Sequence, residues 1–246
     1  MTHKHLPIFL LFFILSAFSA AAKMPAEDTG SMKKTAPPLQ RFYVGGSMDG
    51  AIFSTASGTT PINSKISTVR FTYGFNLGAS FNWNLGRHFG VYTGLDLKNI
   101  GFIEKYNAVT TKRRTYNLGV PVGIKIGNMS PKKMYVFLGG GADVPLNYRV
   151  KTFTVRNEKT KYNEWFSNAT PLIMPYVFAG LALNHGFTIK AQYYPNNYLN
   201  PEYIYKGAKV NAGYDVQLIL FSLGFYMNYS RHHDMVKKHV TEMNTM

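Results

Sequence analysis

The chain has 246 residues, of which 16% are charged and 15% aromatic, and its formal net charge is +15. The charged fraction is low beside the ~25% of ordinary soluble proteins, which favours an all-β wall over a helical enzyme. The absence of cysteine excludes disulfides and thiolate metal sites. The scattered lysines and arginines accompany no nucleic-acid-binding motif, so an anionic membrane surface is a better counterpart than nucleic acid.

The first 22 residues have the parts of a secretory signal peptide: a basic start at Lys4, an apolar core over residues 6–18 and small residues at 20–22. The core is short for a spanning helix of ~20 residues. We therefore expect Sec-dependent export, cleavage after residue 22 and a flexible periplasmic leader over residues 23–40, which contain charges and several prolines.

The clearest pattern in the mature chain covers residues 69–85. Every odd position from Val69 to Leu85 is apolar, and every even position is polar or glycine. A period of two indicates a β-strand with two different faces. This strand is longer than the ~5–6 residues usual in soluble domains and long enough to cross a bilayer core of ~30 Å at a tilt of ~45°. One bulky apolar face and one small polar face are typical of a transmembrane barrel strand.

Seven further segments alternate in the same way. They are residues 41–53, 89–98, 115–126, 134–150, 175–183, 187–194 and 215–229. This pattern places Ile52 and Tyr148 on the apolar faces of residues 41–53 and 134–150. The sequence therefore predicts an eight-stranded antiparallel up-and-down transmembrane β-barrel over residues 41–229.

The connections between these segments alternate in length. Three are short, at residues 84–88, 127–133 and 184–186, and four are long, at residues 54–68, 103–114, 151–170 and 195–212. Outer-membrane barrels have short periplasmic turns and longer outer loops, so both termini are expected in the periplasm. A soluble barrel of the lipocalin type is the alternative, but there the bulky face points inward, whereas here the charges share the face of the small residues.

One short motif resembles a known family. It consists of Leu118, Val120, Pro121, Val122, Ile124 and Lys125. This segment resembles the L-x-V-P-L-x-x-K signature of the outer-membrane β-barrel domain common in Bacteroidota, and residues 135–141 resemble the glycine-rich strand that follows it there. The group includes the PorT proteins, associated with type IX secretion. The family often has an acidic residue where this chain has Gly119. Pro121 cannot donate a ladder hydrogen bond and is expected to mark a bulge.

Strand parity points eight charged side chains into the barrel. They are Asp49, Arg70, Asp96, Lys98, Lys125, Asp143, Arg149 and Lys190. Eight strands leave an interior just wide enough for side chains, and charges of both signs in that space should pair, because a lone buried charge is costly. We expect a polar plug; the alternative is a path for protons or ions.

The sequence predicts no catalytic activity, no cofactor and no metal site. A lipid A-modifying enzyme is the alternative, and it requires a nucleophile and a base. The histidines after the leader are His88, His185, His232, His233 and His239, and none lies on a predicted strand beside a suitable serine or acid. The last three lack a standard metal-ligand spacing.

Two of the long connections are basic. Residues 103–114 hold four cations against Glu104, and residues 151–170 hold four cations against two acids, with Trp165 and Phe166. Such loops suit lipopolysaccharide or a partner protein, with ordinary lipid-headgroup contact as the alternative. We therefore expect a structural or interaction protein of the outer membrane, or else a secretion-associated barrel of the PorT kind.

The last predicted strand ends in Ser222, Gly224, Met227 and Tyr229. This spacing resembles the closing-strand signal that barrel assembly machinery recognises. Met227 and Tyr229 share the lipid-facing parity, and an aromatic residue at the periplasmic edge fits the girdle of such barrels. Residues 230–246 are expected to form a basic periplasmic tail and not a ninth strand.

Overall fold

The computed structural model describes residues 39–129, 134–154 and 158–228. The predicted signal peptide and most of the leader, Tyr229 of the assembly signal and the basic tail lie outside these residues.

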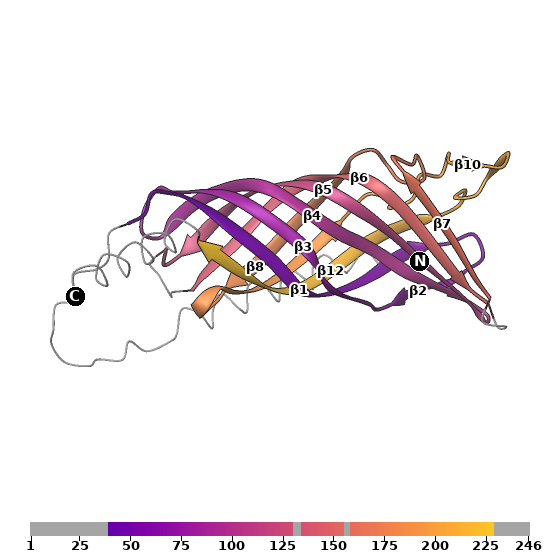
Figure 1. Cartoon of the computed structure of the whole chain (residues 1–246), viewed down its shortest axis with the longest axis horizontal. Coiled ribbons are helices and arrows are strands. Elements are labelled where there is room, and N and C mark those ends of the chain that lie inside the picture. Colours follow the sequence, from indigo (N-terminus) through magenta and orange to yellow (C-terminus); the bar gives the residue numbers. More distant parts are fainter. Residues whose placement is uncertain (1–38, 130–133, 155–157, 229–246) are drawn as a thin grey trace, which may run out of the picture. The chain divides into compact units, whose positions relative to one another are not determined.

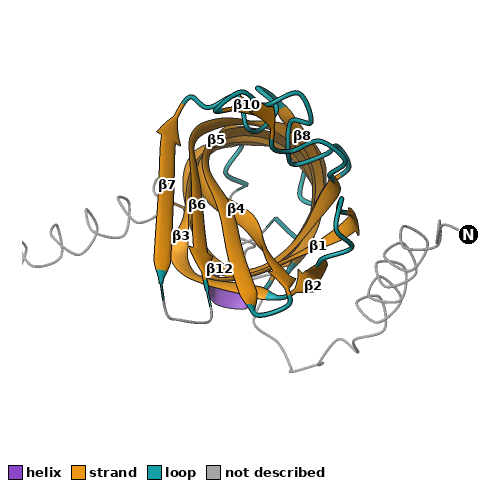
Figure 2. Cartoon of the chain, turned by 90° about the vertical axis from the view of Figure 1, so that its right-hand side faces the viewer, coloured by secondary structure: helices purple, strands orange, loops and turns teal. Residues whose placement is uncertain are grey.

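Eight antiparallel strands close into a ring, which confirms the predicted all-β barrel (Figures 1 and 2). They are β1 (Phe42–Thr59), β3 (Arg70–Asn84), β4 (Phe89–Tyr106), β5 (Val109–Gly127), β6 (Tyr135–Phe153), β8 (Met174–Ala182), β9 (Phe187–Tyr194) and β12 (Asp215–Asn228). Each strand pairs with the next along the ring, and β12 pairs with β1. Closure satisfies the backbone groups that an edge strand would leave unpaired.

Four shorter strands and one turn complete the described structure. They are β2 (Lys65–Thr68), which pairs with β4; β7 (Lys159–Trp165), which pairs with β6 outside the ring; the small hairpin β10 (Ile204–Tyr205) and β11 (Ala208–Lys209); and the 3-10 turn η1 (Asn184–Gly186). Figure 2 shows β7 standing beside the ring, with the connection that carries β10 over one part of its opening.

The outer wall of the ring is apolar. On β3, Phe71, Leu77, Phe81 and Trp83 are all exposed, whereas Asn82 between the last two is buried. The same alternation on the other ring strands produces a continuous apolar band, as expected of a wall in contact with lipid. No helix in the described ranges is long and apolar enough to span a membrane.

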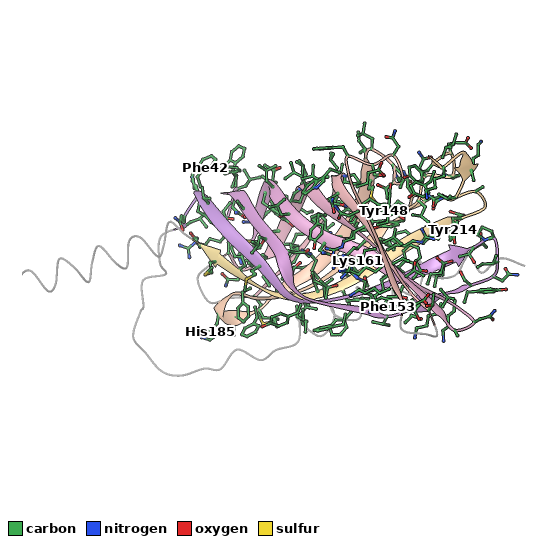
Figure 3. The ribbon with its side chains drawn as sticks, turned by 45° about the vertical axis from the view of Figure 1, so that its right-hand side comes forward. Phe42, Tyr148, Phe153, Lys161, His185 and Tyr214 are labelled. Atoms are coloured by element: carbon green, nitrogen blue, oxygen red, sulfur yellow. The ribbon has the colours of Figure 1, made fainter. Side chains whose placement is uncertain are left out.

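The barrel has two unlike ends. The short-turn end carries the connections after β3, β5 and β8, together with the start of β1 and the end of β12. The long-connection end carries the links from β1 to β3, β6 to β8 and β9 to β12. In Figure 3, Phe42 and His185 lie at the short-turn end and Phe153 lies toward the other end.

The expected loop over residues 103–114 is wrong. β4 continues to Tyr106 and β5 begins at Val109, so Asn107 and Ala108 alone form the turn, with Asn107 at a φ of 49°. Asparagine tolerates this left-handed conformation better than most residues. β4 and β5 continue beyond the apolar band, where their outward residues become mostly polar. The sequence pattern depends on apolar outward residues, so it ends where the band ends.

Two register shifts change the face of the residues that follow. One lies between Asp49 and Ala51 of β1, and the other lies at Leu146 of β6. Beyond them Ile52 and Tyr148 are 0% and 3% exposed inside the ring, not facing lipid as predicted. An inserted residue reverses every later side chain, because the strand period is two. Arg149, next to Tyr148, is therefore on the outer face, which corrects its predicted inward position.

The bulge expected at Pro121 is also absent. The register between β4 and β5 is the same on both sides of Pro121, and that between β5 and β6 passes through it unchanged. The β4 ladder instead lacks the two pairs that would involve Val120 and Pro121. The hydroxyl of Thr93 donates to the Pro121 carbonyl at 2.9 Å, a side-chain bond beside the interrupted ladder.

Candidate functional site

The middle of the lumen is held by an ion network on Asp143. Lys98 Nζ lies 3.0 Å from Asp143 Oδ1 and 3.8 Å from Asp96 Oδ2. The Tyr194 hydroxyl donates to Asp143 Oδ2 at 2.6 Å, and the Lys98 ammonium lies 3.7 Å from the centre of the Tyr176 ring. Lys98 is 2% exposed and Asp143 is 0% exposed, so each charge is neutralised within the protein interior.

A second ion pair crosses the same part of the lumen. Lys190 Nζ on β9 lies 3.0 Å from Asp49 Oδ2 on β1, and the Asn76 amide donates to the same carboxylate at 3.1 Å. Asn76 also accepts the backbone N–H of Asn99 at 3.1 Å, where β3 separates from β4. Arg70 donates to the Asn99 side chain there, and its Nη1 is buried without a partner.

Lys125 is buried near the short-turn end without an acidic partner in the described residues. Its ammonium donates to Tyr43 Oη at 2.9 Å, Asn82 Oδ1 at 3.0 Å and Asn84 Oδ1 at 2.9 Å. Three neutral oxygens match the three donors of an ammonium group. Lys125 is 1% exposed, so the polar side chains of β1 and β3 replace the water that it loses.

A cavity of about 80 Å³ separates Lys125 from the ion pairs. Asp49, Asp96, Lys125 and Lys190 contribute to its lining, together with a set of aromatic side chains that includes Tyr92, Tyr135, Phe137, Tyr176, Phe178 and Tyr226. The space is large enough for a few water molecules. Its aromatic walls leave little room for a larger solute.

The connection between β9 and β12, residues 195–214, places buried side chains inside the ring, whereas its residues 204–210 are exposed. We call it the inner segment. Tyr198 and Leu199 are both 0% exposed, and the Tyr198 hydroxyl donates to Thr115 Oγ1 of β5 at 3.3 Å. The Tyr198 ring packs edge-on against Phe102 at a centroid distance of 5.6 Å. The inner segment was predicted as an outer loop, and its buried anchors give no periodic signal in the sequence.

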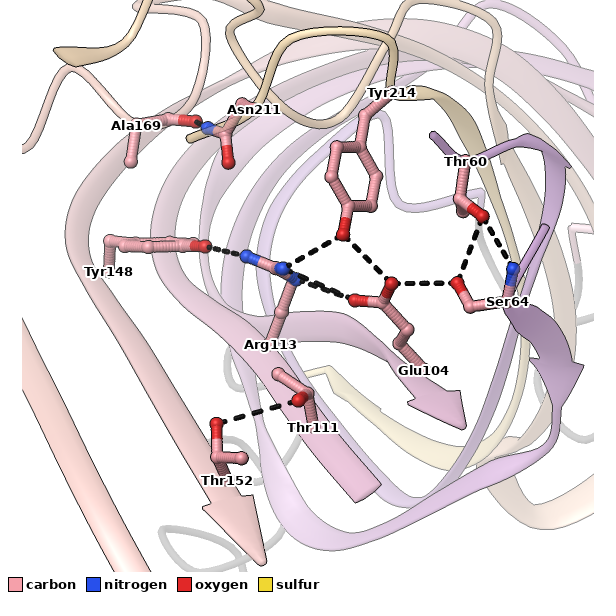
Figure 4. A network of polar contacts seen from close by, with 10 residues as sticks. All are labelled: Thr60, Ser64, Glu104, Thr111, Arg113, Tyr148, Thr152, Ala169, Asn211 and Tyr214. Carbon is pink, nitrogen blue, oxygen red and sulfur yellow. Dashed lines mark hydrogen bonds and ion pairs between the residues drawn. The ribbon is translucent and has the colours of Figure 1, made fainter. Parts of the chain in front are cut away.

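A polar network at the long-connection end joins strands to the inner segment (Figure 4). Nε and Nη2 of Arg113 both donate to Glu104 Oε2 at 3.2 Å, and Arg113 Nη1 donates to the Tyr148 hydroxyl at 3.1 Å. The other oxygen of Glu104 accepts from Tyr214 at 2.8 Å and from Ser64 at 2.7 Å. The loop prediction missed this network. Had the inward parity of Thr115 and Asn117 been extended along β5, it would have placed Arg113 inside.

The motif residues divide between the two faces of β5. Leu118, Val120 and Val122 are exposed on the apolar wall, whereas Pro121 is buried. A Cβ atom on Gly119 would lie 2.3 Å from Asp143 Oδ1, so the carboxylate of β6 fills the space that an acidic side chain at this position would need.

The assembly-signal residues also alternate. Ser222 is buried and Met227 is 57% exposed on the outer wall. A Cβ on Gly224 would lie 2.6 Å from the Met48 carbonyl and 2.7 Å from Asp49 Oδ1, so this inward position requires glycine.

The structure gathers no hydrolytic or metal-binding set among the described residues. His88 and His185 lie in turns at the short-turn end, and His185 is part of η1. No group of three or more His, Asp or Glu side chains in the described ranges is placed to hold a metal ion. The other three histidines considered lie outside those ranges.

A closed ring with an apolar wall and a charged interior agrees with the family comparison. A family model described as outer membrane protein beta-barrel domain matches residues 41–231. The chain belongs to this family. It is accordingly an outer-membrane protein, as predicted from its strands. A comparison with curated proteins found no match.

Several solved outer-membrane barrels are similar to this chain. Ail of Yersinia pestis, in a complex with the heparin analogue sucrose octasulfate, is 14% identical with a TM-score of 0.40, covering 77% of this chain and 99% of Ail. The Neisserial surface protein NspA is 16% identical with a TM-score of 0.41, covering 76% and 96%. CarO of Acinetobacter baumannii is 14% identical with a TM-score of 0.30, covering 72% and 96%.

Proposed function

We propose that this outer-membrane barrel is a structural or interaction protein whose lumen is closed and whose long-connection end faces the cell surface. The observation that carries the proposal is the inner segment. Its buried Tyr198 and Leu199 lie between the ion network on Asp143 and the Glu104–Arg113 network, so three packed layers follow one another along the lumen. An interior filled in this way is expected of eight strands.

The interaction role rests on what the long-connection end presents. Its outward cations make lipopolysaccharide, other envelope lipids or an envelope protein the suitable partners, and assembly would proceed through the barrel assembly machinery. We propose no catalytic activity and no cofactor, because the two described histidines lie in turns away from the ion networks. Unchanged lipid A by mass spectrometry in an overexpressing strain would agree with this, and a new lipid A species would favour the enzyme.

A secretion-associated role of the PorT kind, in a member of the Bacteroidota, is the second candidate. The motif from Leu118 to Lys125 favours it, because this is where the chain resembles that group. Deletion of the gene would then abolish the export of secreted proteins, whereas a purely structural role would leave export unchanged.

Conductance tests the closed lumen. The refolded protein, first shown to migrate differently on gels before and after heating, is inserted into a planar bilayer beside a reference porin. We expect no steady conductance from this chain under conditions in which the porin conducts. Sustained channels of porin size would contradict the proposal.

A further inference from the structure

Three adjacent strands present a grid of outward side chains at the long-connection end. The paired residues of β5, β6 and β7 form four rows: Tyr116, Asn147 and Trp165; Arg114, Arg149 and Asn163; Lys112, Lys151 and Lys161; and Thr110, Phe153 and Lys159. Directly paired residues of antiparallel strands lie on the same face. Six cations therefore share one face, and none of the twelve grid residues is acidic. We call this surface the basic face.

The cations of the basic face lie close to one another without an acidic residue among the twelve. Lys112 and Lys159 lie over the Phe153 ring, 5.3 and 5.6 Å from its centre, and Arg114 lies over the Tyr116 ring at 5.9 Å. Lys112 is paired with Lys151, and Lys151 with Lys161, so three ammonium groups follow one another across three strands. Like charges placed directly opposite each other destabilise a sheet. The Nε atoms of Arg114 and Arg149, in the neighbouring row, are both buried without a hydrogen-bond partner. Six cations on one face with no acid among the twelve residues indicate a place for an anion.

The height of the basic face suggests which anion. Toward the long-connection end, the outward residues of β5 are Val120, Leu118, Tyr116, Arg114 and Lys112 in that order. This order passes from lipid-facing apolar residues through an aromatic residue to two cations, with ~6.6 Å of strand between successive outward positions. Aromatic girdles mark the membrane interface, so Arg114 and Lys112 lie at the depth of lipid headgroups.

We propose that the basic face binds the phosphorylated headgroup of a glycolipid in the outer leaflet. Guanidinium and ammonium groups are the preferred protein donors to phosphate. The face continues the lipid-contacting wall, so a lipid beside the barrel reaches it without leaving the membrane. The exposed Trp165 ring and the half-buried Phe153 ring on the same face would contact its sugar or acyl portions. The inference rests on the proposed orientation, with the long-connection end at the cell surface.

Binding of lipid A in detergent tests the proposal. The probes are lipid A with its phosphates and the same lipid A after their removal, titrated into the refolded full chain and followed by native mass spectrometry. The test variant combines Lys112→Gln, Lys151→Gln and Lys161→Gln. The matched control combines Lys65→Gln, Lys206→Gln and Lys209→Gln, which remove the same charge from exposed positions at the same end that are not paired with any residue of the basic face. A heat-modifiable band establishes that each variant is folded.

We expect the test variant to bind phosphorylated lipid A about 100-fold more weakly than the unmodified chain, since each surface cation contributes ~1 kcal/mol toward an anionic membrane. The control should change affinity several-fold at most, and dephosphorylated lipid A should bind weakly to all three proteins. Equal affinity of the test and control variants, or equal affinity for the two lipids, would overturn the proposal. Displacement by millimolar inorganic phosphate would assign the site to free phosphate instead of a headgroup.

Conductance separates this proposal from the proposed function. A silent barrel that ignores lipid A phosphates would overturn the basic face and leave the closed lumen intact. A conducting barrel that binds lipid A phosphates would overturn the closed lumen and leave the basic face intact.

Discussion

Asp143 is the residue on which the middle of the lumen depends. Its two oxygens accept hydrogen bonds from Lys98 at 3.0 Å, Tyr194 at 2.6 Å and Asn117 at 3.4 Å. Gly119 on the adjacent strand provides the space for this carboxylate. One side chain of β6 thereby connects β4, β5 and β9 across the interior.

Replacement of Asp143 by leucine should destabilise the barrel by about 3–5 kcal/mol, because it leaves the Lys98 ammonium buried without its close partner. Urea titration in lipid vesicles, followed by the heat-modifiable band, measures the loss. The double variant Asp143→Leu with Lys98→Met removes both charges and should recover much of this stability. A double variant as unstable as the single one would show that charge pairing is not the cause.

At the scale of the element, β7 is attached to the inner segment through Glu164. Its carboxylate accepts hydrogen bonds from the hydroxyls of Ser167, Tyr162 at 2.6 Å and Tyr203 at 3.1 Å. The Ser167 and Tyr162 hydroxyls hold the pKa of Glu164 below its ordinary value, because their hydrogen bonds lower this pKa by more than partial burial raises it. β7 pairs with β6 outside the ring, so this carboxyl titrates outside the membrane-spanning wall.

Attachment of β7 should therefore weaken in acid. The pKa of Glu164 is lower in the folded state than in the unfolded state, where it is about 4.3. The contact is therefore fully stabilised at pH values above the unfolded pKa, and this stability is lost as the pH falls through the folded pKa. Hydrogen exchange over residues 158–170, corrected for intrinsic rates, should rise below pH 4 relative to that of the β3–β4 wall. The Glu164→Gln variant should lose this pH dependence. An unchanged acid response in that variant would contradict the assignment.

For the whole molecule, the decisive feature is the apolar band. On β12 the outward residues Ile219, Phe221, Leu223, Phe225 and Met227 cover the height of the wall, with Leu223 at the middle. Gln217 is the outward residue beyond the band toward the long-connection end.

A charge should therefore cost most at Leu223. We expect Leu223→Arg to destabilise the folded barrel by about 2–4 kcal/mol and Gln217→Arg by about 0–1 kcal/mol, since the penalty falls from the bilayer midplane to the interface. Urea unfolding of both variants in the same vesicles gives the comparison. Equal costs at the two positions would show that the band is not centred on Leu223.

Within the apolar band the sequence was sufficient, apart from the β1 register shift between Asp49 and Ala51, where Ala51 pairs with Leu223. The predicted segment at residues 187–194 has the bounds of β9, and that at residues 69–85 differs from β3 by one residue at each end. A strand between lipid and a narrow polar lumen must place apolar and polar residues in strict alternation, so its faces are visible in the chain. Strand number followed from that constraint, and outer-membrane location followed from it together with the signal peptide and the alternating connection lengths.

Beyond the band, tertiary structure decided. There the outer face meets headgroups or water and no longer requires apolar residues. The extensions of β4 and β5 and the added strand β7 therefore show no apolar–polar alternation in the sequence. The register shifts that move Arg149 outward and, within the band, Ile52 inward depend on pairing with neighbouring strands. Tyr198 inside the ring and Lys112, Lys151 and Lys161 in one row arise from contacts between residues distant in sequence. Sequence alternation describes the surroundings of a single strand, whereas these contacts exist only once the ring has closed.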